Sequence, residues 1–119
     1  MTEARQKLDR LWQRGRDFLG CELAIMGGAM SWVSERNLVA AISNGGGFGV
    51  IASGSMSPEL LALEIDATFA RTAKPFGVNL ITMHPQLTEL IAVCGRLARA
   101  RAAGSGPGAG GQQHLRSRG

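Results

Sequence analysis

The chain has 119 residues, enough for one small domain, and its 45% hydrophobic and 18% charged content excludes a wholly disordered polypeptide. The formal net charge of +4 comes from one end: residues 1–94 carry eight Lys/Arg against nine Asp/Glu, whereas residues 95–119 carry five Arg and no acid. Because this end contains no aromatic side chain, its basicity does not indicate a nucleic-acid surface, and we expect no nucleic-acid partner.

The apolar pattern predicts an amphipathic helix over residues 4–19. Large apolar side chains recur there at spacings of three, four and seven, namely Leu8, Leu11, Trp12 and Phe18 or Leu19. Gly20 then ends the helix, since glycine readily adopts the left-handed conformation that closes helices.

A first strand–helix unit is predicted after this helix. Its strand covers residues 22–26, a short apolar run, and a loop over residues 27–33 leads to a helix that Ser34 caps and that runs to Ser43. The helix face expected to be buried comprises Leu38, Ala41 and Ile42.

The second and third units carry clearer signals. A strand over residues 48–52 is followed by Ser57 and Pro58, a serine N-cap with a proline at the first helical position, and this helix should run to about Thr72 on Leu61, Ile65 and Phe69. A third strand, residues 76–81, is apolar on both faces, which is typical of a parallel sheet. The helix expected after Pro85 carries Leu87, Leu90, Ile91 and Val93 or Cys94.

The composition changes at Gly95, beyond which Gly, Arg and Ala dominate. Such a segment buries too little apolar surface to offset the entropy of ordering it. We therefore divide the chain into a folded part, residues 1–94, and an Arg/Gly/Ala-rich tail, residues 95–119, and expect disorder from about residue 102.

Cysteine usage and hydropathy predict a cytoplasmic protein. Cys21 and Cys94 offer no disulfide framework, and we expect both to be buried, reduced thiols. Neither a secretory leader nor a run of about 18 apolar residues is present, so no membrane is expected. Trp32 and Phe48 are expected in the core.

A ligand is expected at the loops that follow the strands, because βα arrays build their active face there. Three loops meet this condition, residues 27–31, 53–55 and 79–84. The glycine-rich run 45–49 precedes its strand and lacks the G-x-G-x-x-G spacing, which argues against a dinucleotide fingerprint, and no Walker A sequence occurs.

The loop after the first strand offers small residues against which a planar ligand could lie: Gly28, Ala29, Met30 and Ser31. Met30 could present its peptide N–H and its soft side chain. The alternative is that these glycines only permit a sharp turn after the strand.

Two polar residues accompany the third strand. Asn79 interrupts an apolar run, and a buried amide needs hydrogen-bond partners, which a bound heterocycle or the neighbouring strand could supply. His84 has no carboxylate or cysteine at a recognisable spacing, so it is more typical of a helix-entry residue than of an acid or base. No catalytic residue and no metal ligand is assigned.

The runs GGAMSWVSERNLVAAISNGGGFGVIASGSMSPELL and KPFGVNL occur in an order and spacing that resemble the N-terminal third of nitronate monooxygenases, formerly called 2-nitropropane dioxygenases. FMN-dependent enoyl-ACP reductases are also similar. The likeness covers about residues 18–94 and does not extend into the tail.

The resemblance implies an α/β fold, a partial TIM (β/α)8 barrel with about three βα units after an N-terminal helix, because a complete barrel needs roughly 250 residues. It implies FMN as cofactor, contacted by Gly28, Ala29, Met30, Ser31 and the Asn79 of the G-V-N-L motif. The implied reaction is oxidation of an alkyl nitronate by FMN and O2. The family's catalytic His and phosphate-binding segment would fall beyond residue 119.

Three alternatives stay open. The activity could be that of an FMN-dependent enoyl-ACP reductase. The chain alone could be an inactive fragment, frameshifted near residue 95, because three parallel strands leave two edges unpaired. The tail could tether a βα domain to nucleic acid, in which case salt-dependent binding would disappear without residues 95–119. Nothing in the sequence indicates the oligomeric state.

Overall fold

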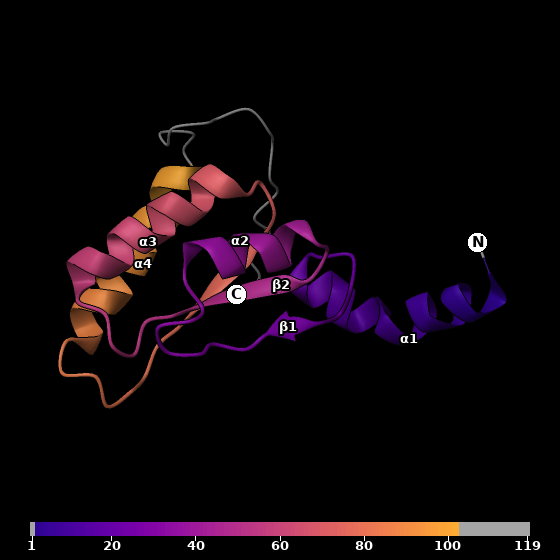
Figure 1. Cartoon of the computed structure of the whole chain (residues 1–119), viewed down its shortest axis with the longest axis horizontal. Helices are drawn as coiled ribbons and strands as arrows, with labels where there is room; N and C mark the ends of the chain where they lie inside the picture. Colours follow the sequence, from indigo (N-terminus) through magenta and orange to yellow (C-terminus); the bar gives the residue numbers. More distant parts are fainter. Residues whose placement is uncertain (1, 103–119) are drawn as a thin grey trace.

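The computed structural model describes residues 2–102, which form three parallel strands alternating with helices. The strands lie in the order β1-β2-β3, so each strand neighbours the next one in the chain (Figure 1). Helix α2 packs on β2 and against α3, and α3 packs against α4. This arrangement confirms the predicted α/β class with about three βα units after an N-terminal helix.

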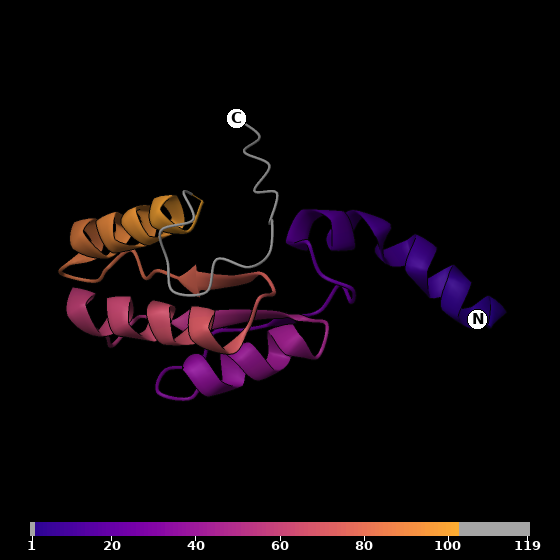
Figure 2. The ribbon, with the colours of Figure 1, turned by 90° about the horizontal axis from the view of Figure 1, so that it is seen from above.

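Helix α1, Glu3–Leu19, confirms the predicted N-terminal helix. Thr2 caps its start by accepting the N–H of Arg5, and Gly20 ends it with a φ of 68°. The helix projects away from the sheet and the other helices (Figures 1 and 2), and Phe18 on its apolar side is 86% exposed. No residue of α1 is buried against the described part of the chain.

Strand β1, Met26–Gly27, is shorter and later than the predicted strand over residues 22–26. The Ile25 N–H donates to the carbonyl of Leu23 two residues earlier, a tight turn that breaks the extended run. Pairing with β2 is irregular before Met26, where Leu23 N–H donates to Gly46 O. The sequence could not reveal this local turn because all its residues are compatible with a strand.

Helix α2, Arg36–Asn44, corrects two predictions. Its N-cap is Glu35 rather than Ser34, since the Glu35 carboxylate accepts the N–H groups at the start of the helix. The buried residues are Val39, Ala40 and Ser43 instead of Leu38, Ala41 and Ile42.

The approach of α2 to the sheet explains the different face. A Cβ added at Gly49 would collide with the backbone carbonyl of Val39, so glycine at this position in β2 lets the helix backbone lie directly on the strand. Val39 is consequently fully buried.

The remaining elements follow the predictions more closely. Strand β2, Phe48–Ala52, leads to α3, Pro58–Arg71, whose N-cap is Ser57 and whose C-cap is Thr72, as expected. Strand β3, Phe76–Asn79, ends two residues before the predicted boundary.

Helix α4, Leu87–Ala102, begins after Pro85 as predicted and continues through Gly95. The expected division between residues 94 and 95 therefore falls inside a helix. Leu90 and Val93 are buried, whereas Ile91, expected on the same face, is exposed. Residues 103–119, most of the predicted tail, lie outside the described residues.

The hydrophobic core lies between β2 and the helices α2, α3 and α4. It consists of Val39, Ile51, Met56, Leu61, Ile65, Leu90 and Val93. Because β2 is the central strand and is almost wholly buried, its carboxyl end provides a fixed base for the loops that follow all three strands.

Candidate functional site

The parallel strands bring the predicted ligand-binding loops to one edge of the sheet. Gly27 in β1 pairs with Gly49 in β2, which pairs with Phe76 in β3, and the last pair along β2 and β3 is Ala52 with Asn79. Gly27 is thus level with Phe76, three residues before Asn79, and the loop after Gly27 reaches the level of Asn79 at Ser34, whose carbonyl accepts the N–H of Ala52. Strand β2 separates β1 from β3, and the axes of these two outer strands lie about 10 Å apart.

Ser34 fixes the loop after β1, a role that the sequence did not reveal. Its buried hydroxyl accepts the Met30 N–H at 2.9 Å and donates to the Gly28 carbonyl at 3.3 Å. Its own carbonyl accepts the N–H of Ala52 at 3.0 Å, which ties the loop to the end of β2. With its hydroxyl used in this way, Ser34 leaves the capping of α2 to Glu35.

This arrangement corrects one prediction about Met30 and preserves the rest of the loop as a ligand surface. The Met30 N–H is not available to a ligand, because Ser34 accepts it. Within residues 2–102, by contrast, no group accepts the N–H of Ala29 or of Ser31. A Cβ added at Gly28 would meet nothing within 4 Å, so the backbone there can be approached closely.

The loop ends in a tight turn that exposes Trp32. Val33 N–H donates to Met30 O at 3.0 Å, and Trp32 has a φ of 64° at the turn position where glycine or asparagine is favoured. Trp32 is 72% exposed, so the prediction that it belongs to the core was wrong. Phe48, the other residue expected in the core, is only partly buried.

Asn79 lies at the predicted edge but is exposed rather than buried. Its carbonyl accepts the Ser53 hydroxyl at 2.5 Å, a bond that joins the ends of β2 and β3. Its side-chain amide has no hydrogen-bond partner within the described part of the chain. The amide is therefore free to donate to and accept from a ligand.

The residues around the carboxyl edge fit a planar heterocycle such as the FMN ring. Free backbone N–H groups lie in the loop after β1, an open approach exists at Gly28, and the Asn79 amide is free nearby. Polar atoms of a ring system need donors and acceptors of this kind, and glycine permits close contact with the ring face.

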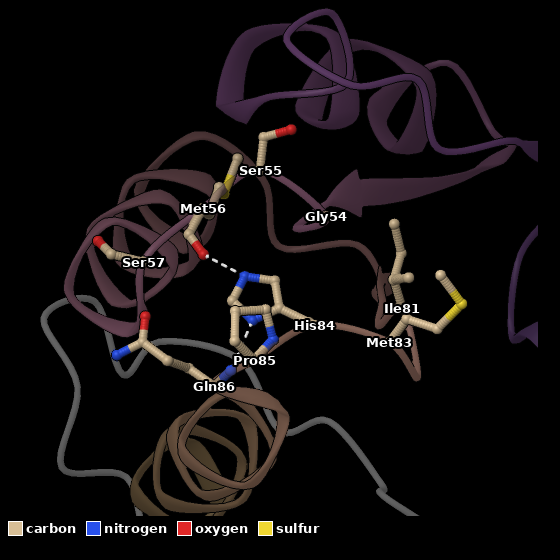
Figure 3. Close-up of a pocket in the computed structure, with 9 residues that line it drawn as sticks. All are labelled: Gly54, Ser55, Met56, Ser57, Ile81, Met83, His84, Pro85 and Gln86. Atoms are coloured by element: carbon tan, nitrogen blue, oxygen red, sulfur yellow. Dashed lines mark hydrogen bonds between the residues drawn. The ribbon is translucent and has the colours of Figure 1, made fainter.

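His84 has both ring nitrogens engaged. Nδ1 accepts the Gln86 N–H at 3.0 Å, so Nε2 carries the proton and donates to the Met56 carbonyl, also at 3.0 Å (Figure 3). The ring thus joins the loop after β2 to the turn before α4. This confirms the interpretation of His84 as a helix-entry residue.

A hollow of about 540 Å³ opens beside His84, between the loops that follow β2 and β3. Ile81 and Met83 stand on one side of the His84 ring, and Ser57 and Gln86 lie on the other (Figure 3). The sequence pointed to both loops but gave no sign of a hollow between them.

Within residues 2–102 no three His, Cys, Asp or Glu side chains are grouped so that they could hold a metal ion. No helix of the described range is long and apolar enough to cross a bilayer. Both cysteines are free and half-buried, and burial raises the pKa of the Cys94 thiol.

Comparison with known families decides the relationship of the chain. A model of the nitronate monooxygenase family matches residues 13–103, most of the chain. The chain belongs to the nitronate monooxygenase family. The match is longer than the resemblance seen over residues 18–94 and includes helix α4 past Gly95.

Individual members of the nitronate monooxygenase family and their relatives agree with this assignment. The chain is 33% identical over 78 residues to a probable nitronate monooxygenase of Staphylococcus aureus, a match covering 64% of the chain and 22% of that protein. It is 41% identical over 64 residues to the (3aS,4S,5R,7aS)-5-hydroxy-7a-methyl-1-oxo-octahydro-1H-indene-4-carboxyl-CoA dehydrogenase of Mycobacterium tuberculosis, covering 54% of the chain and 18% of the relative.

A solved structure matches the fold of this nitronate monooxygenase family member. FabK from Thermotoga maritima superposes with a TM-score of 0.70 at 40% identity, over 71% of the chain and 27% of FabK. The three βα units are thus similar to part of FabK, and the chain spans about a fifth of the length of the curated relatives it matches.

Proposed function

We propose that this chain provides part of an FMN site in a flavin-dependent oxidoreductase that oxidises alkyl nitronates with O2. The proposed contacts are Gly28, Ala29, Met30, Ser31 and Asn79. The observation that carries the proposal is their common edge: the loop after β1, with two free N–H groups, and the free amide of Asn79 at the end of β3 lie on either side of the carboxyl end of β2.

The residues of this chain would bind and orient the flavin. The N–H groups of Ala29 and Ser31 are donors for the polar ring atoms, and the Ser34 hydroxyl keeps their loop in one conformation. The Asn79 amide can donate and accept at the same edge. When bound, FMN supplies the electron-accepting chemistry, while the protein positions the substrate against it.

No proton transfer is assigned to the described residues. His84 is the imidazole nearest to the proposed contacts in sequence, and both of its nitrogens already have backbone partners. The phosphate group of the flavin is likewise assigned no partner in residues 2–102. We therefore propose that a polypeptide of these 119 residues alone does not retain stoichiometric FMN and does not turn over a nitronate.

An FMN titration of the ¹⁵N-labelled full chain tests the proposal. Added FMN should shift the amide signals of residues 28–31 and the side-chain amide of Asn79 in a saturable manner, while signals of α1 stay unchanged. Asn79→Ala should weaken this binding several-fold, and the matched control Asn37→Ala, which changes an exposed amide on α2, should not. Shifts confined to other regions, or none, would contradict the FMN site.

The absence of activity is tested separately. The purified chain should show no flavin absorbance band after gel filtration and no nitronate-dependent O2 uptake. If the chain kept its flavin and turned over nitronate, the proposal that it supplies only one part of the site would be wrong.

An FMN-dependent enoyl-ACP reductase is the second candidate. The likeness to FabK at 40% identity supports it, and the match to a carboxyl-CoA dehydrogenase supports a thioester as an alternative to a nitronate substrate. Both candidates use the same proposed flavin contacts. They differ in the substrate. A competition experiment that measures whether an alkyl nitronate or an enoyl thioester binds more tightly therefore distinguishes them.

A further inference from the structure

The hollow between the loops after β2 and β3 has the size and position of a ligand site. Its volume of about 540 Å³ lies within the range of small-molecule pockets, about 300–1,000 Å³. It opens at the carboxyl edge of the sheet, where Asn79 ends β3 two residues before Ile81. A ligand at the proposed flavin contacts could therefore reach it.

The lining of the hollow indicates an uncharged ligand. No Lys, Arg, Asp or Glu is among the residues that form it. His84 presents only its ring, because both nitrogens are bonded to the backbone. Neither a phosphate nor a carboxylate would find a charged side chain there, so the lining favours an uncharged part of a ligand.

One side of the hollow is strongly apolar and exposed. Met83 is 88% exposed and Ile81 is 43% exposed, and both stand beside the His84 ring (Figure 3). The flexible thioether of Met83 next to the branched side chain of Ile81 suits a ligand of variable shape. A ligand that covers both side chains removes their apolar surface from water, which favours binding. The walls can also adjust, because Ile81 lies against Gly54, which has no side chain of its own.

We propose that this hollow binds the unbranched alkyl tail of the substrate whose reacting end lies at the flavin. The inference rests on the proposed function, which places the reacting carbon at the flavin contacts. From there the tail extends past Asn79 towards Ile81 and Met83. Its chemistry is that of a hydrocarbon chain, whether the chain belongs to an alkyl nitronate or to an acyl thioester.

Methionine methyl NMR on the full chain tests the tail site without requiring bound flavin. Met56 and Met83 line the hollow, whereas Met26 lies in β1, outside both the hollow and the proposed flavin contacts, and serves as the internal control. The probes are the nitronates of nitromethane and of 1-nitrohexane, and the hexanoyl thioester of N-acetylcysteamine. We expect saturable shifts of the Met56 and Met83 methyl signals with the two probes that carry a six-carbon chain, the nitronate of 1-nitrohexane and the hexanoyl thioester, here called the hexyl probes.

The length of the alkyl chain determines how much more tightly the longer probes should bind. Each fully buried CH2 group strengthens binding roughly fourfold, so the hexyl nitronate should bind at least about tenfold more tightly than the methyl nitronate. A preference for the nitronate over the thioester would identify the tail as that of a nitronate, and the reverse preference would assign it to an acyl thioester. Both results support the alkyl-tail site.

A matched pair of variants checks the location. Met83→Gln removes the exposed apolar wall at similar side-chain length and should weaken the hexyl probes about three- to tenfold. Leu63→Gln, which changes an exposed apolar residue on α3, should leave their affinity unchanged. Both sites are exposed, so neither variant threatens folding.

Three results would overturn the tail site: no methyl shift with the hexyl probes, an equal shift at Met26, or unchanged affinity in Met83→Gln. These outcomes are distinguishable from failure of the FMN proposal, which is read from the amide signals of residues 28–31 and of Asn79. Methyl shifts without an FMN response would leave the tail site standing and refute the flavin contacts.

Discussion

The carboxylate of Glu64 joins two helices, and its removal should destabilise the chain. Glu64, only 7% exposed in the middle of α3, accepts the Arg36 guanidinium at 2.8 Å and the Arg36 backbone N–H at 3.0 Å. One side chain therefore pairs a cation and also satisfies a donor at the start of α2.

The size of the effect follows from these contacts. In Glu64→Gln the charge is lost and one oxygen becomes an amide NH2 group, which faces donors instead of accepting from them. Charged hydrogen bonds contribute about 1.5–3 kcal/mol each, but the Arg36 side chain is 32% exposed and water can replace part of the loss. We expect a decrease of about 2 kcal/mol in the free energy of unfolding.

Urea denaturation of the full chain, followed by circular dichroism, measures this difference. Asp66→Asn is the matched control, because it neutralises an exposed acid on the same helix and should change stability by less than about 0.5 kcal/mol. If Glu64→Gln were as stable as the control, the bond between α2 and α3 would not contribute to folding as argued.

The same pair predicts a pH dependence. The hydrogen bond from Arg36 lowers the pKa of Glu64 below its ordinary value of 4.5, against the opposing effect of burial. A carboxyl group with a lowered pKa in the folded state stabilises the protein above its unfolded pKa and loses this contribution as the pH falls through the folded value. The stability difference between the wild-type chain and Glu64→Gln should therefore be constant from about pH 5 to 8 and shrink below about pH 4.5.

Three further substitutions and reactions test other parts of the structure. Gly49→Ala should destabilise the chain by about 3 kcal/mol or more in urea denaturation, because its methyl group collides with the backbone of α2, whereas Gly28→Ala, in open space, should have little effect. Ser34→Ala should cost about 1–2 kcal/mol and speed hydrogen exchange in the loop after β1; the exposed Ser55→Ala is its control, and equal behaviour of the two would refute the role of the hydroxyl. Cys94, whose pKa is raised by burial, should react with iodoacetamide at pH 8 more slowly than free N-acetylcysteine, and equal rates would contradict the burial.

Elements with self-contained signals were predictable from the sequence. Ser57 and Pro58 specify the start of α3 by capping and fixed φ alone, and the structure begins the helix at Pro58. The apolar run at 48–52 became β2 without adjustment, because a strand buried on both faces needs little information beyond its own residues. The order of the βα units then placed the three loops on one edge.

The details of the candidate site depended on contacts between distant residues. Ser34 and Glu35 can both cap a helix, and only the bonds of Ser34 to Met30 and Gly28 decide that Glu35 does so. Trp32 looked like a core residue by size, but a tight turn directs it outwards. Asn79 was assigned to the correct edge, whereas its exposure depends on which elements cover the sheet, which its neighbours in sequence do not encode.

The imidazole of His84 fastens one loop to the other. Because Nδ1 is bonded to Gln86 in the same turn, only the bond from Nε2 to the Met56 carbonyl crosses from one loop to the other, and widening the hollow between them requires this bond to break. A bulky ligand that spreads the loops would therefore have to compensate for its loss. His84, to which no role in the reaction is assigned, would in this way limit how easily the two loops separate.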